Sequence, residues 1–310
     1  MNKGPHITDV RSLVVTGSHE ELPQGYGLRV LIARLVRGEN LPRHEAFQLL
    51  DCLLDAAATD AQVAAALIAL AVKGETVEEL IGIASAMRER AVRIRASHER
   101  FLDTAGIGSS SAKTFNVSTA AAFVIAGAGL PVAKHGNRAV TSRSGSSDVL
   151  SALDVRITAS PDVSEKCLNE IGICFMFAPL YHLTTRRVAT IRRELGVRTV
   201  FNLLGPLTNP AGAPFQVLGV SRIAQVEPLA QALAALGTKR AWVVHGLDGL
   251  DEITLAEKTV VAEVNGEEIQ TFKLDPSHFG LRHSSIEHLA CRRRPSKRPH
   301  YFRRPLSTAT

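Results

Sequence analysis

The sequence predicts a two-domain α/β protein, in which a small all-helical N-terminal domain precedes a larger domain with a mostly parallel central sheet. Three observations support this fold class: a helical pattern from Leu31 to about Arg95, short β-branched runs between Gly-rich turns after Phe101, and a strand–helix–strand unit later in the chain. With 310 residues, 45% of them hydrophobic, the chain is long enough to fill two domain cores.

The N-terminal helical domain is expected at residues 28–97. Two helix starts are recognisable there, because Thr59 is followed by Gln62 and Thr76 by Glu79, the capping-box spacing in which each side chain accepts the other residue's free backbone N–H. Behind the second start, apolar residues recur at helical spacing and place one stripe on one face: Leu80, Ile83, Ala84, Met87 and Ala91.

The α/β domain is expected at residues 98–290. An Ala-rich helix is expected at residues 120–128, and Glu227–Leu236 is a helix between two strands, as a parallel crossover requires. Asn265-Gly266 predicts a type I′ hairpin, because both residues tolerate positive φ. The expected strands are Pro131–Ala133, Ile171–Phe177, Gln216–Val220 and Ala241–Val244, followed by the hairpin strands Thr259–Val264 and Glu268–Leu274.

The two ends of the chain differ from the body. Residues 1–27 lack periodicity and are predicted to be a poorly ordered leader. Residues 291–310 form a basic tail with seven Lys and Arg and no acid; subtracting these from the net charge of +6 leaves −1 for the rest. The body is therefore not basic, which argues against a nucleic-acid partner.

Composition also limits location and metal chemistry. No apolar run reaches the roughly 18 residues of a membrane span, and the first residues lack a signal-peptide core, so we expect a cytoplasmic protein without a membrane partner. The four cysteines show no C-x-x-C pair or zinc-ligand spacing, and are interpreted as reduced thiols: Cys52, Cys167, Cys174 and Cys291.

Residues 103–119 (DTAGIGSSSAKTFNVST) form the first candidate site. A glycine- and serine-rich loop that enters a helix exposes backbone N–H groups and hydroxyls at the positive end of the helix, which suits phosphate. The alternative is a flexible turn in which Ser118 or Thr119 is an ordinary N-cap, and the residues alone leave both interpretations open.

Residues 134–148 (KHGNRAVTSRSGSSD) form the second candidate site, directly after an apolar strand. Three cations, several hydroxyls and two glycines at the carboxyl end of a strand favour an anionic ligand. Within this segment, Ser147 or Asp148 is also a candidate N-cap of a helix at Val149–Leu153.

Two further motifs carry charge. Asp251-Glu252 follows an apolar strand and offers hard oxygen ligands for Mg²⁺, although an acidic pair at a turn is commonly solvated surface. Arg192 precedes Phe201–Pro210, which Gly-Pro and Asn-Pro are expected to fix as a loop. Arg192 offers a fork for a carboxylate, or is a solvated helix charge.

Taken together, the four motifs resemble those of the anthranilate phosphoribosyltransferases, a family of the tryptophan pathway, over about residues 31–289. The most specific stretches are Lys134–Arg138, Ser144–Ser147, Thr114–Thr119, Phe201–Pro206 and Asp251-Glu252. The resemblance implies a nucleoside phosphorylase/phosphoribosyltransferase-like fold and a homodimer. It also implies an active site between the domains that transfers a phosphoribosyl group from phosphoribosyl pyrophosphate to anthranilate with Mg²⁺.

Carried over by position, the resemblance implies three overlapping groups of site residues and three catalytic residues, Lys134, Asn137 and Arg192. Phosphoribosyl pyrophosphate would contact Gly106, Gly108, Ser109, Ser110, Thr114, Asn116, Ser118, Thr119, Lys134, Ser142 and Ser146. Anthranilate would contact Gly106, His135, Asn137 and Arg192, and magnesium would contact Ser118, Asp251 and Glu252.

The chain departs from the family pattern in two places. Where the family reads Gly-Thr-Gly-Gly-Asp, residues 106–110 read Gly-Ile-Gly-Ser-Ser, so the loop keeps two glycines and loses its acid. After His288 a basic stretch with Pro295, Pro299 and Pro305 stands in place of apolar helices, and these prolines prevent a long helix.

Two other functions remain open from the sequence. One is a non-catalytic nucleic-acid-binding relative that uses the basic tail, and the other is a nucleoside phosphorylase of similar fold. The nearly neutral body and the Lys134–Asn137 motif favour the transferase.

Overall fold

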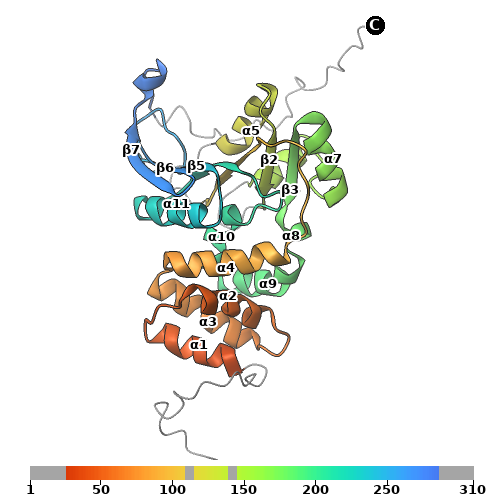
Figure 1. Cartoon of the computed structure of the whole chain (residues 1–310), viewed down its shortest axis with the longest axis vertical. Coiled ribbons are helices and arrows are strands. Elements are labelled where there is room, and N and C mark those ends of the chain that lie inside the picture. Colours follow the sequence, from red (N-terminus) through yellow and green to blue (C-terminus); the bar gives the residue numbers. More distant parts are fainter. Residues whose placement is uncertain (1–25, 109–114, 139–144, 286–310) are drawn as a thin grey trace, which may run out of the picture.

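The computed structural model describes residues 26–108, 115–138 and 145–285 (Figure 1). The basic tail 291–310 therefore lies outside the described residues, as do Ser109, Ser110, Thr114 and Ser142 of the predicted site. The predicted leader lies outside as far as residue 25, whereas Tyr26 and Gly27 already belong to the first helix. None of the helices in the described part of the chain is both long and apolar enough to cross a membrane.

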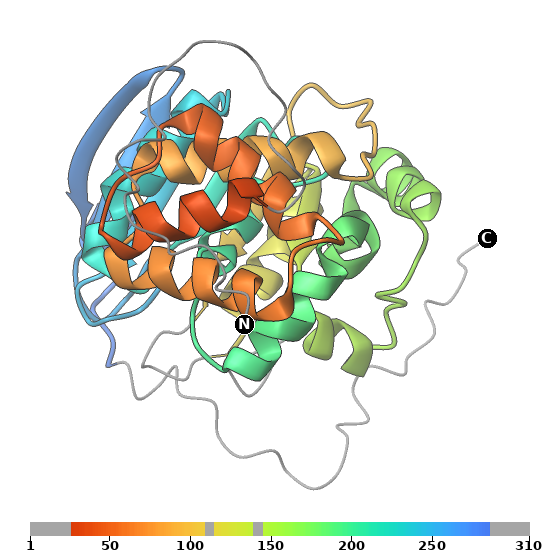
Figure 2. The ribbon, with the colours of Figure 1, turned by 90° about the horizontal axis from the view of Figure 1, so that it is seen from below.

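Four helices form the N-terminal part of the chain, seen from below in Figure 2. Both predicted capping boxes are confirmed: Thr59 Oγ1 accepts the Gln62 backbone N–H at 3.2 Å, and Thr76 Oγ1 accepts that of Glu79 at 3.3 Å. The helices are α1 (Tyr26–Val36), α2 (Arg43–Leu54), α3 (Asp60–Lys73) and α4 (Val77–Arg90).

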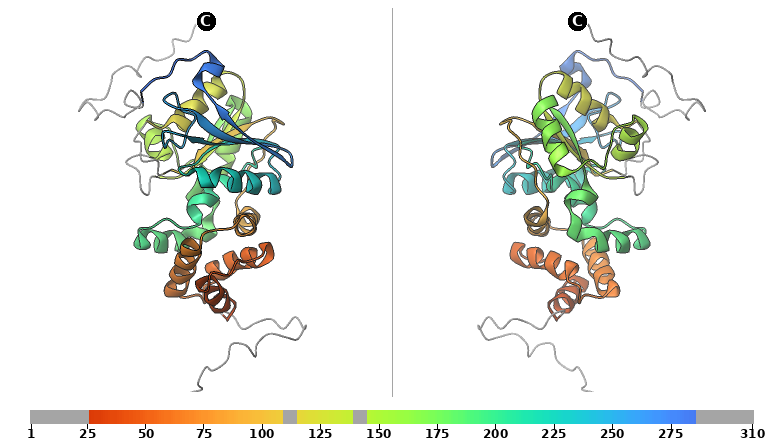
Figure 3. Two further views of the ribbon diagram at one scale, coloured as in Figure 1. Left: turned by 90° about the vertical axis from the view of Figure 1, so that its left-hand side faces the viewer. Right: turned by 90° about the vertical axis from the view of Figure 1, so that its right-hand side faces the viewer.

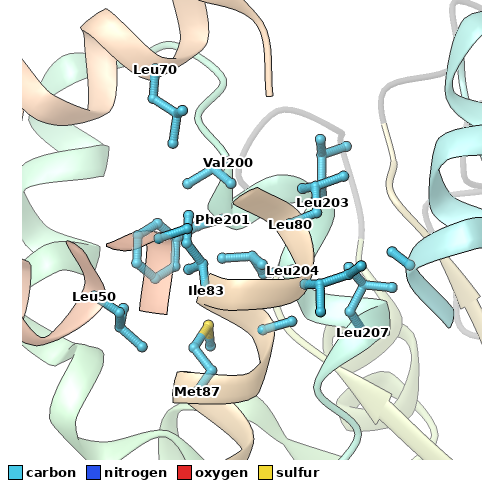
Figure 4. Packing of buried hydrophobic residues seen from close by; sticks show 14 of the residues in the cluster. Leu50, Leu70, Leu80, Ile83, Met87, Val200, Phe201, Leu203, Leu204 and Leu207 are labelled. Atoms are coloured by element: carbon cyan, nitrogen blue, oxygen red, sulfur yellow. The ribbon is translucent and has the colours of Figure 1, made fainter. Parts of the chain in front are cut away.

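Helix α4 joins this helical part to the rest of the molecule. Its predicted apolar stripe is buried at Leu80, Ile83, Ala84 and Met87, and it packs against the buried face of α10 (Phe201–Leu207), as Figure 4 shows. One hydrophobic cluster therefore runs from the helical layer to the underside of the sheet. Burying one side chain of the size of Leu, Ile or Met stabilises the fold by about 1.5–3 kcal/mol.

The second part of the chain is a seven-stranded sheet in the order β3-β2-β1-β4-β5-β6-β7. The first five strands in this order are parallel, and β6 and β7 are antiparallel, so the predicted fold class is confirmed. The strands are β1 (Leu102–Gly106), β2 (Val132–Gly136), β3 (Ile173–Phe177), β4 (Phe215–Gly219), β5 (Arg240–Gly246), β6 (Thr259–Asn265) and β7 (Glu268–Leu274).

Helices cover both faces of this sheet, as the side views of Figure 3 show. Helix α11 (Val226–Ala235) packs on β5 and β6, on the side of the helical layer, whereas α5 (Val117–Gly127) packs on β1 and β2. The remaining helices are α6 (Ser146–Ala152), α7 (Pro161–Ile171), α8 (Ala178–Tyr181) and α9 (Arg186–Leu195), with short 3-10 turns at Leu183–Thr185, Ile223–Gln225 and Pro276–Phe279.

Most predicted elements of the sheet are confirmed with small shifts in their ends, including the two hairpin strands. The predicted type I′ turn centred on Asn265-Gly266 was wrong, because Asn265 pairs with Glu268 and the turn residues are Gly266 and Glu267. Gly266 has a φ of +62° and Asn265 has no positive φ, and glycine at the first of two turn positions is typical of a type II′ turn.

Residues 103–106, however, were expected to belong to a loop, and instead Leu102–Gly106 form β1, which lies inside the sheet. The sequence pattern missed this strand because buried polar residues, Asp103 and Thr104, occupy its middle.

The prediction of a loop over Phe201–Pro210 was wrong for its first part, because residues 201–207 form α10 with Pro206 inside it. Burial of Phe201, Leu203, Leu204 and Leu207 outweighs the helix-breaking tendency of Gly205-Pro206 in so short a helix.

The predicted caps of α5 and α6 were also placed too late. Helix α5 has Asn116 as its N-cap, so Ser118 and Thr119 lie in its first turn. Helix α6 has Gly145 as its N-cap, and Asp148 accepts the Gly145 backbone N–H at 2.8 Å.

Candidate active site

The candidate site lies at the carboxyl ends of the parallel strands. Register pairs Gly106 with Gly219 and Gly136 with Phe177, so these strand ends share one edge of the sheet. Ligands of open α/β sheets bind at this edge. The chain leaves β1 toward α5 here, leaves β2 toward α6, and leaves β5 toward Asp251-Glu252.

Gly219 lets Asp251 lie directly against the sheet, and Gly106 lies near the Asp251 carboxylate. A Cβ on Gly219 would stand 1.7 Å from the Asp251 carbonyl oxygen, and one on Gly106 would stand 3.5 Å from Asp251 Oδ2. The backbone N–H of Gly108 also donates to the Asp251 carboxylate. The predicted phosphate loop and the predicted metal ligand are therefore adjacent, although 143 positions separate Gly108 from Asp251 in the chain.

Glu252 and Lys134 meet at the first turn of α5. The Ser118 backbone N–H donates to the Glu252 carboxylate, while Lys134 Nζ donates to Ser118 Oγ at 3.2 Å and to the Thr104 carbonyl. Lys134 is only 4% exposed, so its ammonium belongs to the floor of the site.

Burial shifts the pKa values of these charged groups toward their neutral forms. It raises the pKa of Glu252 to about 7, with a further rise from the negative charge of Asp251, and it raises the pKa of Asp251. Burial likewise lowers the pKa of Lys134, against the attraction of Asp103 and Glu252. Two carboxylates this close, both poorly hydrated, favour a bound cation.

The oxygen donors fit magnesium. Within residues 26–108, 115–138 and 145–285, no group of three or more His, Cys, Asp or Glu side chains is arranged to hold a metal ion. The acidic pair Asp251-Glu252 and the Ser118 hydroxyl are the oxygen donors that the sequence predicted. Mg²⁺ is commonly held by one or two carboxylates, with waters and substrate phosphates completing its shell. The chemistry of these donors therefore matches the predicted ion.

A second group of predicted residues gathers around α10. His135 Nδ1 lies 3.0 Å from the Gly205 carbonyl oxygen, and Arg192 Nη2 donates to Asn202 Oδ1 at 3.2 Å. Residues 202 and 205 are three apart in one helix and so share a face. The Arg192 guanidinium also lies over the Phe201 ring, 5.2 Å from its centroid.

Polar atoms in this second group lack partners among the described residues. They include the buried Arg192 Nε and the Nε2 atoms of His135 and His182, whose ring centroids are 5.2 Å apart. Burial lowers the pKa of His135 to about 3 and that of His182 to about 4, so both rings are neutral at pH 7. Arg192, with a pKa lowered by burial to about 10, stays charged and is suited to a carboxylate.

The other predicted site residues that the structure describes have fewer contacts with the two groups above. Thr119 is buried in the first turn of α5, and Ser146 begins α6, where a Cβ on Gly136 would lie 2.4 Å from Ser146 Oγ. Asn137 is exposed and its Oδ1 accepts the Arg138 backbone N–H, with no hydrogen bond to His135 or Arg192 within the described residues.

Several residues with clear contacts in the site were not predicted. Asp103 and Asn209 stood inside motifs that had been singled out, but only tertiary contacts reveal their connection, since Asn209 Nδ2 donates to Asp103 Oδ2 at 2.7 Å. Asn202 and Gly219 likewise gave no separate signal, and His182 lies outside every motif.

Comparison with known proteins agrees with this geometry. The family described as "Glycosyl transferase family, a/b domain" matches residues 98–301, and its helical bundle domain matches residues 29–91. Anthranilate phosphoribosyltransferase of Pelotomaculum thermopropionicum is 50% identical over 259 residues, which cover 84% of this chain and 75% of that protein. The enzyme of Anaeromyxobacter dehalogenans is 52% identical over 259 residues, 84% of this chain and 77% of that protein.

Solved structures give the same result. The crystal structure of anthranilate phosphoribosyltransferase from Thermus thermophilus has a TM-score of 0.78 and 42% identity, covering 84% of this chain and 77% of that one. The Saccharomyces cerevisiae enzyme in complex with PRPP and Mg has a TM-score of 0.76 and 29% identity, covering 85% and 77%. The chain therefore belongs to the anthranilate phosphoribosyltransferase family of glycosyl transferases.

Proposed function

We propose that the protein transfers the phosphoribosyl group of phosphoribosyl pyrophosphate to anthranilate, giving N-(5-phosphoribosyl)anthranilate and pyrophosphate in tryptophan biosynthesis. The observation that carries this proposal is the presence of two unlike half-sites: an acidic pair beside a helix start, and a half-buried arginine and a neutral histidine that both contact α10. The first suits a phosphorylated, metal-bound donor, and the second suits an aromatic carboxylate.

The donor half-site is assigned to the residues around α5. Ser118, Asp251 and Glu252 would hold Mg²⁺, which when bound supplies positive charge to the pyrophosphate oxygens. The first turn of α5, from Asn116 to Thr119, lies at the positive end of that helix dipole, and Ser146 lies at the start of α6, so both positions favour negative charge. Lys134 adds a buried positive charge below them.

The acceptor half-site is assigned to the residues around α10. Arg192 binds the anthranilate carboxylate through its fork, and the neutral ring of His135 borders the aromatic amine. Asn137, which is exposed and directly follows β2, is proposed to complete this half-site together with Gly106.

The reaction is a displacement at the anomeric carbon of ribose. The C–O bond to pyrophosphate breaks while the anthranilate nitrogen forms a C–N bond on the opposite face, and the nitrogen then loses a proton. An aryl amine is already neutral at pH 7, so positioning and charge stabilisation supply most of the rate, each worth several kcal/mol. We further propose that the enzyme is a cytoplasmic homodimer.

The direct test is anthranilate fluorescence, followed with purified protein, phosphoribosyl pyrophosphate and Mg²⁺. We expect the fluorescence to fall only when all three are present, and the fall to stop when EDTA is added. Inosine or another nucleoside with inorganic phosphate serves as the control. Nucleoside cleavage without anthranilate consumption would instead identify a phosphorylase, and binding to single-stranded DNA without turnover would identify the non-catalytic relative.

Replacing Arg192 by alanine is expected to raise the KM for anthranilate by about 10- to 100-fold, because the substrate carboxylate loses a charged two-pronged donor. The KM for phosphoribosyl pyrophosphate is expected to change less than about twofold, since Arg192 belongs to the other half-site. Steady-state kinetics with each substrate varied in turn measure both values. Arg193→Ala, an exposed neighbour on α9, is the matched control; equal effects of Arg192→Ala on both KM values would contradict the assignment.

A further inference from the structure

Asp103 is a fully buried carboxylate that the proposed reaction does not use. It lies on β1, has 0% exposure, and within the described part of the chain its hydrogen bonds come from neutral groups: Asn209 Nδ2 at 2.7 Å, the His135 backbone N–H at 3.3 Å and the Thr104 backbone N–H. A buried charge held only by neutral donors is costly unless an opposite charge lies nearby.

Lys134 is a buried cation on the neighbouring strand β2. Its partner in register is Thr104, so its side chain and that of Asp103 lie on opposite faces of the sheet and do not meet in a direct ion pair. Lys134 Nζ donates to the carbonyl oxygen and, at 3.3 Å, to the hydroxyl of Thr104, the residue that follows Asp103. In return, His135, the residue that follows Lys134, donates its backbone N–H to Asp103 Oδ1. Residues 103–104 of β1 and 134–135 of β2 are therefore linked twice, by the lysine side chain in one direction and the aspartate side chain in the other.

The charges support this connection. Burial raises the pKa of Asp103 to about 6, and the positive charge of Lys134 is the largest influence that opposes the rise. Burial lowers the pKa of Lys134, and Asp103 is the largest influence that opposes this fall, ahead of Glu252. Each group favours the charged form of the other.

Asn209, in the segment that follows α10, also holds the Asp103 carboxylate. Asn209 Nδ2 donates both to Asp103 Oδ2 and to the Ala133 carbonyl at 2.9 Å, and Asn209 Oδ1 accepts the Ala211 backbone N–H at 2.9 Å. The segment after α10 therefore fixes the position of the carboxylate relative to both strands.

We propose that Asp103 is a positioning residue that acts through Lys134: it supplies a counter-charge across the sheet and, by accepting the His135 backbone N–H, a tether that fixes the lysine ammonium beneath the donor half-site. Lys134 then holds Ser118 Oγ, one of the groups proposed to meet the metal and the phosphates. This inference rests on the proposed function, because the affected substrate is phosphoribosyl pyrophosphate.

The test is a double-mutant cycle of Asp103→Asn, Lys134→Met and the double variant in the full chain. Affinity for phosphoribosyl pyrophosphate with Mg²⁺ is measured by calorimetry, and Tm by circular dichroism. We expect Asp103→Asn to weaken donor binding by about tenfold or more, and to have no further effect when Lys134 is already methionine. The KM for anthranilate is expected to change less than about threefold in Asp103→Asn.

Thermal stability gives a second, independent test, because the effect of Asp103→Asn on Tm is expected to have opposite signs in the wild-type and Lys134→Met backgrounds. Asp103→Asn is expected to lower Tm in the wild-type background, and to raise Tm when introduced into Lys134→Met, because it removes a carboxylate that has lost its cation. This comparison between Lys134→Met and the double variant remains informative even if Asp103→Asn alone does not fold.

If the double variant weakens donor binding by the product of the two single effects, the two residues act independently and the proposal is overturned. A Tm that Asp103→Asn lowers in both backgrounds would also overturn it and leave Asp103 a packing residue. If the wild-type protein does not bind phosphoribosyl pyrophosphate, the proposed function fails, whereas the change of sign in Tm still decides whether the two side chains interact.

Discussion

Replacing Glu252 by glutamine is expected to lower kcat/KM for phosphoribosyl pyrophosphate by about 100-fold or more, which is the usual cost of removing one charge-stabilising group from an active site. Glutamine keeps the size of the side chain but removes its negative charge. Glu252 also lies where Ser118 and Lys134 meet, so the loss affects the metal and the lysine together. The concentration of Mg²⁺ needed for half-maximal activity is expected to rise about tenfold or more.

Initial rates over a series of Mg²⁺ concentrations measure both effects. Glu257→Gln is the matched control, since Glu257 is an exposed acid five positions later and should leave the metal requirement unchanged. If Glu252→Gln and Glu257→Gln share the wild-type dependence on Mg²⁺, then Glu252 does not contribute to a metal site.

Gly219→Ala is expected to damage both activity and stability. Its Cβ would stand 1.7 Å from the carbonyl oxygen and 2.7 Å from the carbonyl carbon of Asp251, and these backbone atoms cannot move away as a side chain can. Overpacking of this kind costs about 1–3 kcal/mol, and a displacement of about 1 Å near reacting groups costs about 100-fold in rate. We therefore expect a lower Tm together with a fall of about 100-fold in kcat/KM.

The control for this substitution is Gly127→Ala at the end of α5, where a Cβ would meet no atom within 4 Å. Alanine there is expected to leave activity unchanged and to preserve or slightly raise Tm, because alanine favours helix over glycine by up to about 1 kcal/mol. Wild-type activity and Tm in Gly219→Ala would show that Asp251 does not need its close approach to β4.

The parts of the fold that local signals determine were predictable from the sequence. The capping boxes at Thr59 and Thr76 depend on a few adjacent residues and appear where the pattern placed them. The predicted hairpin also forms, with its turn at Gly266-Glu267, one residue later than predicted. Strand β1 and helix α10 were not predicted, because burial against distant segments, rather than local propensity, decides their conformation.

The candidate site shows the same division. Motifs that follow parallel strands meet at one sheet edge, so the sequence could indicate that Gly106, Lys134 and Asp251 lie near one another. It could not indicate that Lys134 would be buried or that Asn209 would hold Asp103, because the latter contact joins residues 106 positions apart.

Helix α10 touches Arg192 near its start and His135 at Gly205, while its apolar face is packed against α4. This seven-residue helix lies between the helical layer and the sheet. A displacement of α10 relative to the sheet would therefore change its contacts with Arg192 and His135 together.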